Sequence, residues 1–150
     1  MAITASGIYA VTFEKQMIDT LGQSFEAETH KALMTTDTYT PAFDTHDFRD
    51  DVTNEVTGTG YTLGGNTVIT TDITIGSPAA GQTKLDFADP SWPASTIASA
   101  MCLIHYYNVG SAATDPLSLL LDFVTAVSTT NGTLLVQIAA NGAAYYDLTP

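Results

Sequence analysis

The sequence of 150 residues predicts one mainly β domain spanning residues 1–150, an antiparallel sandwich or barrel with one short helix near the N-terminus. Threonine gives the first indication, because its 25 copies and the other β-branched residues favour strands over helices. The second is the alternation of apolar and polar residues in short segments bounded by Gly, Pro or Asn turn signals. No helical pattern separates these segments, which is typical of antiparallel sheets.

An N-terminal segment, residues 1–22, contains the one convincing helix pattern. Thr12 is expected to cap this helix, Glu14 to lie in its first turn and Gly22 to end it. The apolar residues that recur every four positions are Phe13, Met17 and Leu21. The pattern predicts an amphipathic helix that precedes the sheet.

The residues before this helix are apolar and uncharged, and their large side chains are Ile3, Ile8 and Tyr9. Such a terminus is ordered only when it docks on a hydrophobic surface. That surface is either the core of its own chain or a neighbouring copy, and the sequence leaves both alternatives open. Ile3, Ile8, Tyr9 and the helical Phe13 are therefore candidates for a contact between subunits.

Seven strands are predicted after the helix. They are residues 30–35, 69–75, 83–87, 100–107, 117–127, 133–138 and 144–148. Their expected inward-facing residues include Ile69, Thr71, Ile73, Ile75, Leu85, Phe87, Leu119, Leu121 and Phe123. Residues 89–93 are expected to turn the chain. Asn131-Gly132 and Asn141-Gly142 are hairpin signals, so the last three strands are expected to form a meander.

The formal net charge of −12 comes from 16 acidic residues and only four basic ones. The basic residues are Lys15, Lys31, Arg49 and Lys84. Because phosphate neutralisation requires clustered cations, nucleic acid is not an expected partner. An acidic surface also repels anionic lipid, and no export signal or membrane span is expected, since the apolar run 117–127 is broken by Asp122.

The acidic segment of residues 44–51 is the best candidate metal site. Its possible ligands are Asp44, His46, Asp47, Asp50 and Asp51, and several oxygen ligands in one loop can hold Ca²⁺. The spacing is not that of an EF-hand, however, and Arg49 places a cation in the middle. A solvated loop is therefore expected, with no bound metal and no cofactor, and the three histidines lack zinc-ligand spacing.

Catalytic constellations are equally weak. Cys102 is the only cysteine, which excludes an intrachain disulfide, and its apolar neighbours predict burial. His105 stands three positions away on a predicted strand, so the two side chains are expected on opposite faces. Asp86 and Asp89 could be nominated as a glycosidase pair, but acidic pairs arise by chance in such a chain. The expected protein is not an enzyme.

Trp92 lies between Pro90 and Pro93 in the segment that is expected to turn. It is either an exposed aromatic platform for a sugar or protein, or a loop tryptophan folded over the core. The sequence does not decide between these alternatives, and Trp92 joins the candidate interface residues.

Several segments together resemble small virion structural proteins of tailed bacteriophages. They are MAITASGIYAVTF, ETHKALMTT, TPAFDTHDF, NEVTGTGYTLGG and AAYYDLTP. Proteins of this kind are capsid decoration or cement proteins, head fibres or minor tail components. The resemblance implies assembly on a particle in the bacterial host cytoplasm and a final location in the virion, and it brings no active site.

Two functional hypotheses follow. The first is a structural virion protein, a homo-oligomer that decorates or completes the particle by contacts with its own copies and with other capsid or tail proteins. The alternative is a host-attachment module that binds glycans or proteins through residues 44–51 and Trp92.

Overall fold

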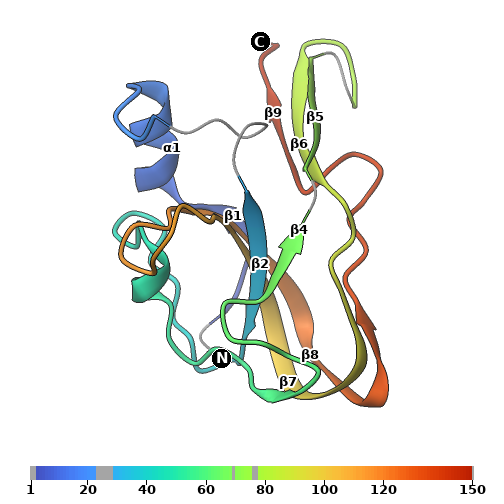
Figure 1. Cartoon of the computed structure of the whole chain (residues 1–150). Helices are drawn as coiled ribbons and strands as arrows, with labels where there is room; N and C mark the ends of the chain where they lie inside the picture. The colour runs from blue at the N-terminus through green and yellow to red at the C-terminus, as the bar shows by residue number, and fades with distance from the viewer. Residues whose placement is uncertain (1–2, 23–28, 69, 76–77, 150) are drawn as a thin grey trace.

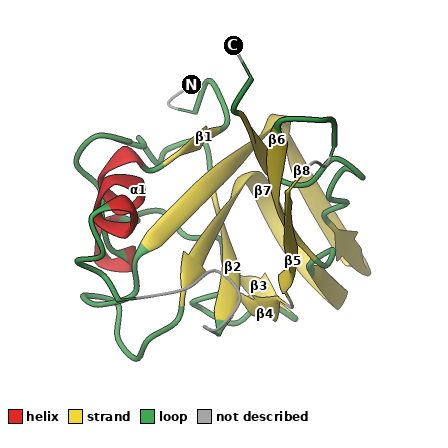
Figure 2. Ribbon diagram, turned by 90° about the horizontal axis from the view of Figure 1, so that it is seen from above, coloured by secondary structure: helices red, strands yellow, loops and turns green. Residues whose placement is uncertain are grey.

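The computed structural model describes residues 3–22, 29–68, 70–75 and 78–149 and confirms a mainly β fold with antiparallel sheets. Its elements in chain order are β1 (Gly7–Ile8), α1 (Ala10–Met17), β2 (His30–Thr35), the 3₁₀ turn η1 (Arg49–Asp51), β3 (Gly58–Thr59), β4 (Asn66–Val68), β5 (Thr70–Ile75), β6 (Gln82–Phe87), β7 (Ser91–Tyr107), β8 (Leu117–Leu135) and β9 (Ala144–Asp147). Helix α1 lies to one side of the strands (Figures 1 and 2).

The larger sheet has the strand order β1-β8-β7-β2-β4. The long strands β7 and β8 form its centre and are joined by the hairpin loop 108–116. One edge of β7 is shared by two strands, because β2 pairs with its C-terminal half and β3 pairs with Ile97 and Thr96 nearer its start. Every pairing in this sheet is antiparallel.

The smaller sheet has the order β5-β6-β9 and is also antiparallel. The chain passes between the sheets from β4 into β5, from β6 through residues 88–90 into β7, and from β8 through residues 136–143 into β9. Strands that cross from one sheet to the other at bends are typical of sandwiches whose corners are closed by the chain itself. In the described part of the chain neither sheet closes into a barrel, which favours the sandwich alternative.

Apolar side chains cover both faces of the larger sheet. The cluster on the face toward the smaller sheet contains Ala32, Met34, Val56, Val68, Phe87, Trp92, Ile97, Ala100, Leu103, Tyr107, Leu119 and Leu134. The cluster on the opposite face contains Ile3, Leu33, Tyr9, Tyr39, Met101, Cys102, Ile104, Tyr106, Leu117 and Leu120. Because successive strand residues point to opposite faces, β2 and the C-terminal half of β7 contribute to both clusters.

The N-terminal segment docks on the core of its own chain. Ile3 and Tyr9 are fully buried in the second cluster, and the Tyr9 hydroxyl lies 3.0 Å from that of Tyr39. Ile8 is half-buried and pairs with Leu119 through the short strand β1. The own-core alternative therefore holds for Ile3 and Tyr9.

The helix is shorter and earlier than predicted. It begins at Ala10 and ends at Met17, so Thr12 lies inside it rather than at its cap, and Gly22 lies beyond its end. Thr12 is the buried residue of the helix, and its hydroxyl reaches the backbone oxygen of Asp47 at 3.4 Å. The predicted amphipathic face is thus turned away from the core, because tertiary contacts overrode the apolar spacing.

The predictions for β7 and β8 were partly wrong. Asn131-Gly132 does not form a hairpin, because β8 continues without interruption to Leu135. Asn131 adopts a left-handed conformation with φ of 47°. It lies at one of several irregularities in the β7–β8 register, and the strand does not reverse there. Trp92 does not lie in a turn either, since it is the second residue of β7 and is fully buried.

The smaller sheet confirms some expectations and corrects others. Phe87 is buried and Leu85 packs against the same cluster, as predicted. The backbone of β5 is a strand, whereas Ile69 and the expected inward side chains of Thr71, Ile73 and Ile75 lie outside the described residues. β9 pairs with β6 instead of with the preceding strand, so the predicted terminal meander is wrong.

The docking of the N-terminal segment can be tested by truncating one side chain. Ile3→Ala should lower the free energy of unfolding by about 2–5 kcal/mol, because it leaves a cavity in a fully buried site. Thr4→Ala, at the exposed neighbouring position, is the matched control and should change it by less than about 0.5 kcal/mol. Urea denaturation followed by circular dichroism measures both, and equal effects would contradict the docking.

A pair of buried histidines links β2 to β7 within the first cluster. The His30 Nδ1 and His105 Nε2 atoms lie 3.0 Å apart, and the His105 ring stacks on Phe87 with centroids 4.7 Å apart. Complete burial lowers the pKa of His105 well below its ordinary value of 6.5, and the neighbouring His30 lowers it further. His105 is therefore neutral in the folded chain at neutral pH.

This lowered pKa predicts a loss of stability in mild acid. Below pH 6.5 the unfolded chain binds a proton at His105 that the folded chain does not, so the free energy of unfolding should fall as the pH drops from 7 toward 5. The slope from this group is at most about 1.4 kcal/mol per pH unit. His105→Phe should flatten the profile in urea titrations across this range, and an unchanged slope would contradict the assignment.

Candidate functional site

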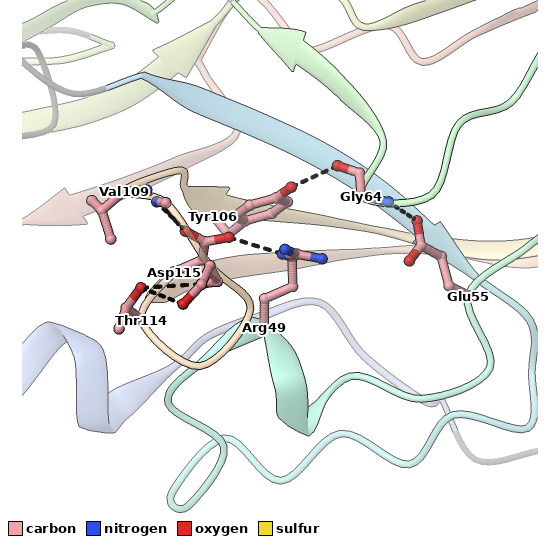
Figure 3. Close-up of polar contacts among 9 residues, drawn as sticks. Arg49, Glu55, Gly64, Tyr106, Val109, Thr114 and Asp115 are labelled. Carbon is pink, nitrogen blue, oxygen red and sulfur yellow. Dashed lines mark hydrogen bonds and ion pairs between the residues drawn. The ribbon is translucent and has the colours of Figure 1, made fainter.

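A partly buried ion pair holds the β7–β8 hairpin loop against the 3₁₀ turn (Figure 3). The Asp115 side chain is fully buried, and its Oδ2 accepts a hydrogen bond from Arg49 Nε at 3.0 Å. Its Oδ1 accepts two further bonds from the backbone N–H groups of Val109 and Gly110. Both carboxylate oxygens are therefore used within the protein, and the pair fixes the hairpin loop.

Tyr106 continues this network into the next loop. The Arg49 guanidinium lies 5.4 Å from the centroid of the Tyr106 ring, and the Tyr106 hydroxyl donates to the Gly64 carbonyl at 2.6 Å. Glu55 accepts hydrogen bonds from the Gly64 N–H and from the Tyr61 hydroxyl. Burial raises the pKa of Tyr106 to about 12, so it remains a neutral donor. The network is a structural connection between loops.

The acidic segment 44–51 does not bring its carboxylates together. Asp47 forms an ion pair with Lys15 of α1 at 2.6 Å, while Asp51 Oδ2 accepts the backbone N–H of Asp47. His46 Nδ1 lies 2.9 Å from the Tyr39 hydroxyl. These contacts tie the segment to the helix and to the second cluster. The loop is partly solvated, since Asp44 and Asp50 are exposed whereas His46, Asp47 and Asp51 are half-buried. The described residues hold no group of three or more His, Cys, Asp or Glu side chains placed to bind a metal.

Cys102 is buried, as predicted. It belongs to the second cluster, whereas Leu103 and Tyr107, which lie two positions on either side of His105, belong to the first. Its Sγ is 3.1 Å from the Thr35 hydroxyl. Burial raises the pKa of the Cys102 thiol to about 11, which keeps it protonated at neutral pH. A thiol of this kind is a weak nucleophile.

The outer face of α1 exposes large apolar side chains. We define the helix surface as Phe13, Met17 and Ile18, of which Met17 is 72% exposed and Ile18 62%. Phe13 stacks on Tyr146 of β9 with ring centroids 5.2 Å apart. Beside them lies a pocket of about 250 Å³ lined by Phe13, Gln16, Met17, Thr83, Leu85, Tyr107 and Tyr146.

Contacts on its inner side hold the helix in this orientation. Lys15 pairs with Asp47 and lies over the Phe48 ring, and the Gln16 amide donates to the Tyr107 hydroxyl. Because these polar groups occupy the protein side, the apolar residues of the helix face outward. Exposed apolar residues that lie together mark protein contact sites more often than scattered ones do.

A second apolar surface lies along the open side of the sandwich, next to β8. Three adjoining pockets share residues along it; the largest, of about 390 Å³, is lined by Ser6–Ile8, Leu119–Leu121, Ala139 and Asn141–Tyr145. The partly buried residues here belong to the first cluster, and Val124, Val127 and Leu135 are exposed. No charged residue stands between Asp122 and Asp147 in the sequence.

The structure separates the five predicted interface residues. Ile3, Tyr9 and Trp92 are fully buried, so their side chains belong to the core. Ile8 is half-buried beside the largest pocket, and Phe13 is 37% exposed on the helix surface. Sequence reasoning missed the exposed edge of β8, although the long uncharged stretch after Asp122 was the signal that could have found it.

Comparison with protein-family models, curated proteins and solved structures finds no match to this chain. Among the described residues, no helix has the length and hydropathy needed to cross a membrane.

The structural role of the partly buried ion pair gives a direct prediction. Asp115→Ala should destabilise the protein by about 2–4 kcal/mol, because it leaves the backbone N–H groups of Val109 and Gly110 unpaired and removes the partner of the partly exposed Arg49. Asp44→Ala, at an exposed position, is the control and should be nearly neutral. Urea denaturation measures both variants, and a small effect for Asp115→Ala would show that the network is dispensable.

Proposed function

We propose that this protein is a structural component of a tailed phage particle and that it decorates or completes the particle by protein–protein contacts. The resemblance of its sequence segments to small virion proteins supports this proposal. In this proposal its location is the virion, its partners are its own copies and other capsid or tail proteins, and it performs no catalysis.

The observation that carries the proposal is the helix surface. Met17 and Ile18 expose most of their side chains to water, and the adjoining pocket with Tyr107 and Tyr146 offers a recess for a partner's side chain. Association that buries Met17 and Ile18 would gain roughly 1.5–3 kcal/mol for each side chain.

Charges around the helix surface indicate the kind of partner. Glu14 and Asp19 are exposed beside it, and the chain as a whole carries a net charge of −12. A particle protein with basic residues around an apolar contact would complement this surface, because complementary charges steer association and exclude wrong partners.

The alternative of a host-attachment module receives less support. It relied on Trp92 as an exposed platform and on residues 44–51 as a binding loop. Trp92 is buried. In the loop, Asp47 and His46 already contact Lys15 and Tyr39, and Asp51 accepts the backbone N–H of Asp47.

The proposal can be tested with the source phage. Mass spectrometry of purified virions should find this chain as a stoichiometric component, and its absence from the particle would overturn the proposal. Virions that lack the protein should bind the purified wild type when it is added back.

Substitution on the helix surface refines this experiment. Met17→Asp should weaken binding to depleted virions by on the order of tenfold or more, because it places a charge in an apolar contact. Leu63→Asp, at an apolar residue 67% exposed outside the helix surface, is the matched control and should bind as the wild type does. Equal binding by both variants would remove the helix surface from the particle contact.

A further inference from the structure

The outer edge of β8 lacks a partner over most of its length. β1 pairs only with Leu119 and Leu120, at the start of the strand. From Leu121 to Leu135 the described residues include no strand on this side. The other side pairs with β7 at Leu121 and Asp122 and again, with irregular register, from Val127 to Leu135. A free strand edge presents backbone N–H and C=O groups that can pair with another chain.

One stretch of this edge is especially accessible. Residues 125–128 are exposed on both faces of the sheet, and residue 129 is half-exposed. Left-handed residues bound the stretch, Val124 with φ of 64° and Asn131 with φ of 47°. Between them no described strand lies on the outer edge, and Val127, which pairs with Ala100 on the other side, is near the middle.

The edge lacks protective charged residues and prolines, although irregularities in the β7–β8 register interrupt it. Natural proteins protect free edges with charged residues, especially Lys, or with Pro, but residues 123–146 contain no proline and no charged side chain. Residues 125–129 are Thr, Ala, Val, Ser and Thr, and the hydroxyls of Ser128 and Thr129 already bond to β7. The edge is complementary to itself through its backbone N–H and C=O groups, which donate and accept hydrogen bonds.

The charge of the protein indicates that the partner of the β8 edge is a second copy of the same chain. Two copies, each with a net charge of −12, repel one another unless they meet where carboxylates are absent. The β8 edge provides such a place. A surface that is uncharged and self-complementary suits a two-fold contact, in which the same patch is used on both subunits.

We infer that residues 125–129 of β8 pair antiparallel with the same residues of a second copy, with Val127 facing Val127 across a two-fold axis. The two sheets then form one continuous sheet through the dimer. This inference rests on the self-association included in the proposed function, and it assigns that contact to a surface separate from the helix surface.

Charge substitutions at the axis test this arrangement. Val127→Asp and Val127→Lys should each weaken self-association by on the order of tenfold or more, because like charges would face one another across the axis. An equimolar mixture of the two variants should associate again, since opposite charges then face one another. Val127→Thr and Leu63→Asp are controls that should associate as the wild type does in sedimentation equilibrium, and circular dichroism melts establish that each variant is folded.

A cysteine at the axis provides a second test that does not depend on weakened binding. Val127→Cys should form a disulfide-linked dimer under mild oxidation, because facing residues in an antiparallel pair have the Cα separation that a disulfide requires. Leu63→Cys is the control, and the native Cys102 is buried. Cross-linking of Leu63→Cys alone would overturn the inference.

The outcomes also distinguish this inference from the proposed function. A wild type that remains monomeric at all concentrations overturns the β8 pairing, whereas incorporation into virions would still support a structural role. A wild type that self-associates but is unaffected by Val127→Asp overturns the pairing and leaves self-association in place. Absence from virions together with a Val127-dependent dimer would contradict the proposed function alone.

Discussion

The structure depends on the need to cover both faces of the central strands. Every residue from Ala100 to Tyr107 is buried, as are most residues of β2. A strand buried on both faces requires a layer on each side, and the chain supplies two different ones. The smaller sheet covers one face, and the N-terminal segment with the loop around Tyr39 covers the other.

The second layer explains the buried polar contacts. It contains little regular structure, so its backbone and side chains must be held by specific bonds. Two sets of contacts serve this purpose: the hydrogen bonds that join Tyr9, Tyr39 and His46, and the ion pair of Asp115 with Arg49. Burial raises the pKa of Tyr39 to about 12, which keeps this hydroxyl protonated. Polar groups buried in this way contribute to uniqueness of the fold only while each remains paired.

Local sequence patterns predicted some strands correctly. They failed where contacts between residues distant in the sequence determine the structure. The strand from His30 to Thr35 was predicted correctly, and five of its six residues are buried. Asn131-Gly132 has the chemistry of a turn, but long-range pairing with β7 keeps the strand continuous. Thr12 was predicted as a cap, whereas the helix begins at Ala10 and Thr12 is buried inside it, next to the backbone oxygen of Asp47.

The candidate surfaces were harder to predict because exposure is a property of the whole fold. The spacing of Phe13 and Met17 identified an apolar helix face, but nothing local indicated that Lys15 and Gln16 would take the inner side. The charges around each surface then suggest different partners. Glu14 and Asp19 beside the helix surface would repel a second copy within the screening distance of about 8–10 Å, while the uncharged β8 edge carries no such penalty. A protein with both surfaces can join its own copies through one and bind a different partner through the other.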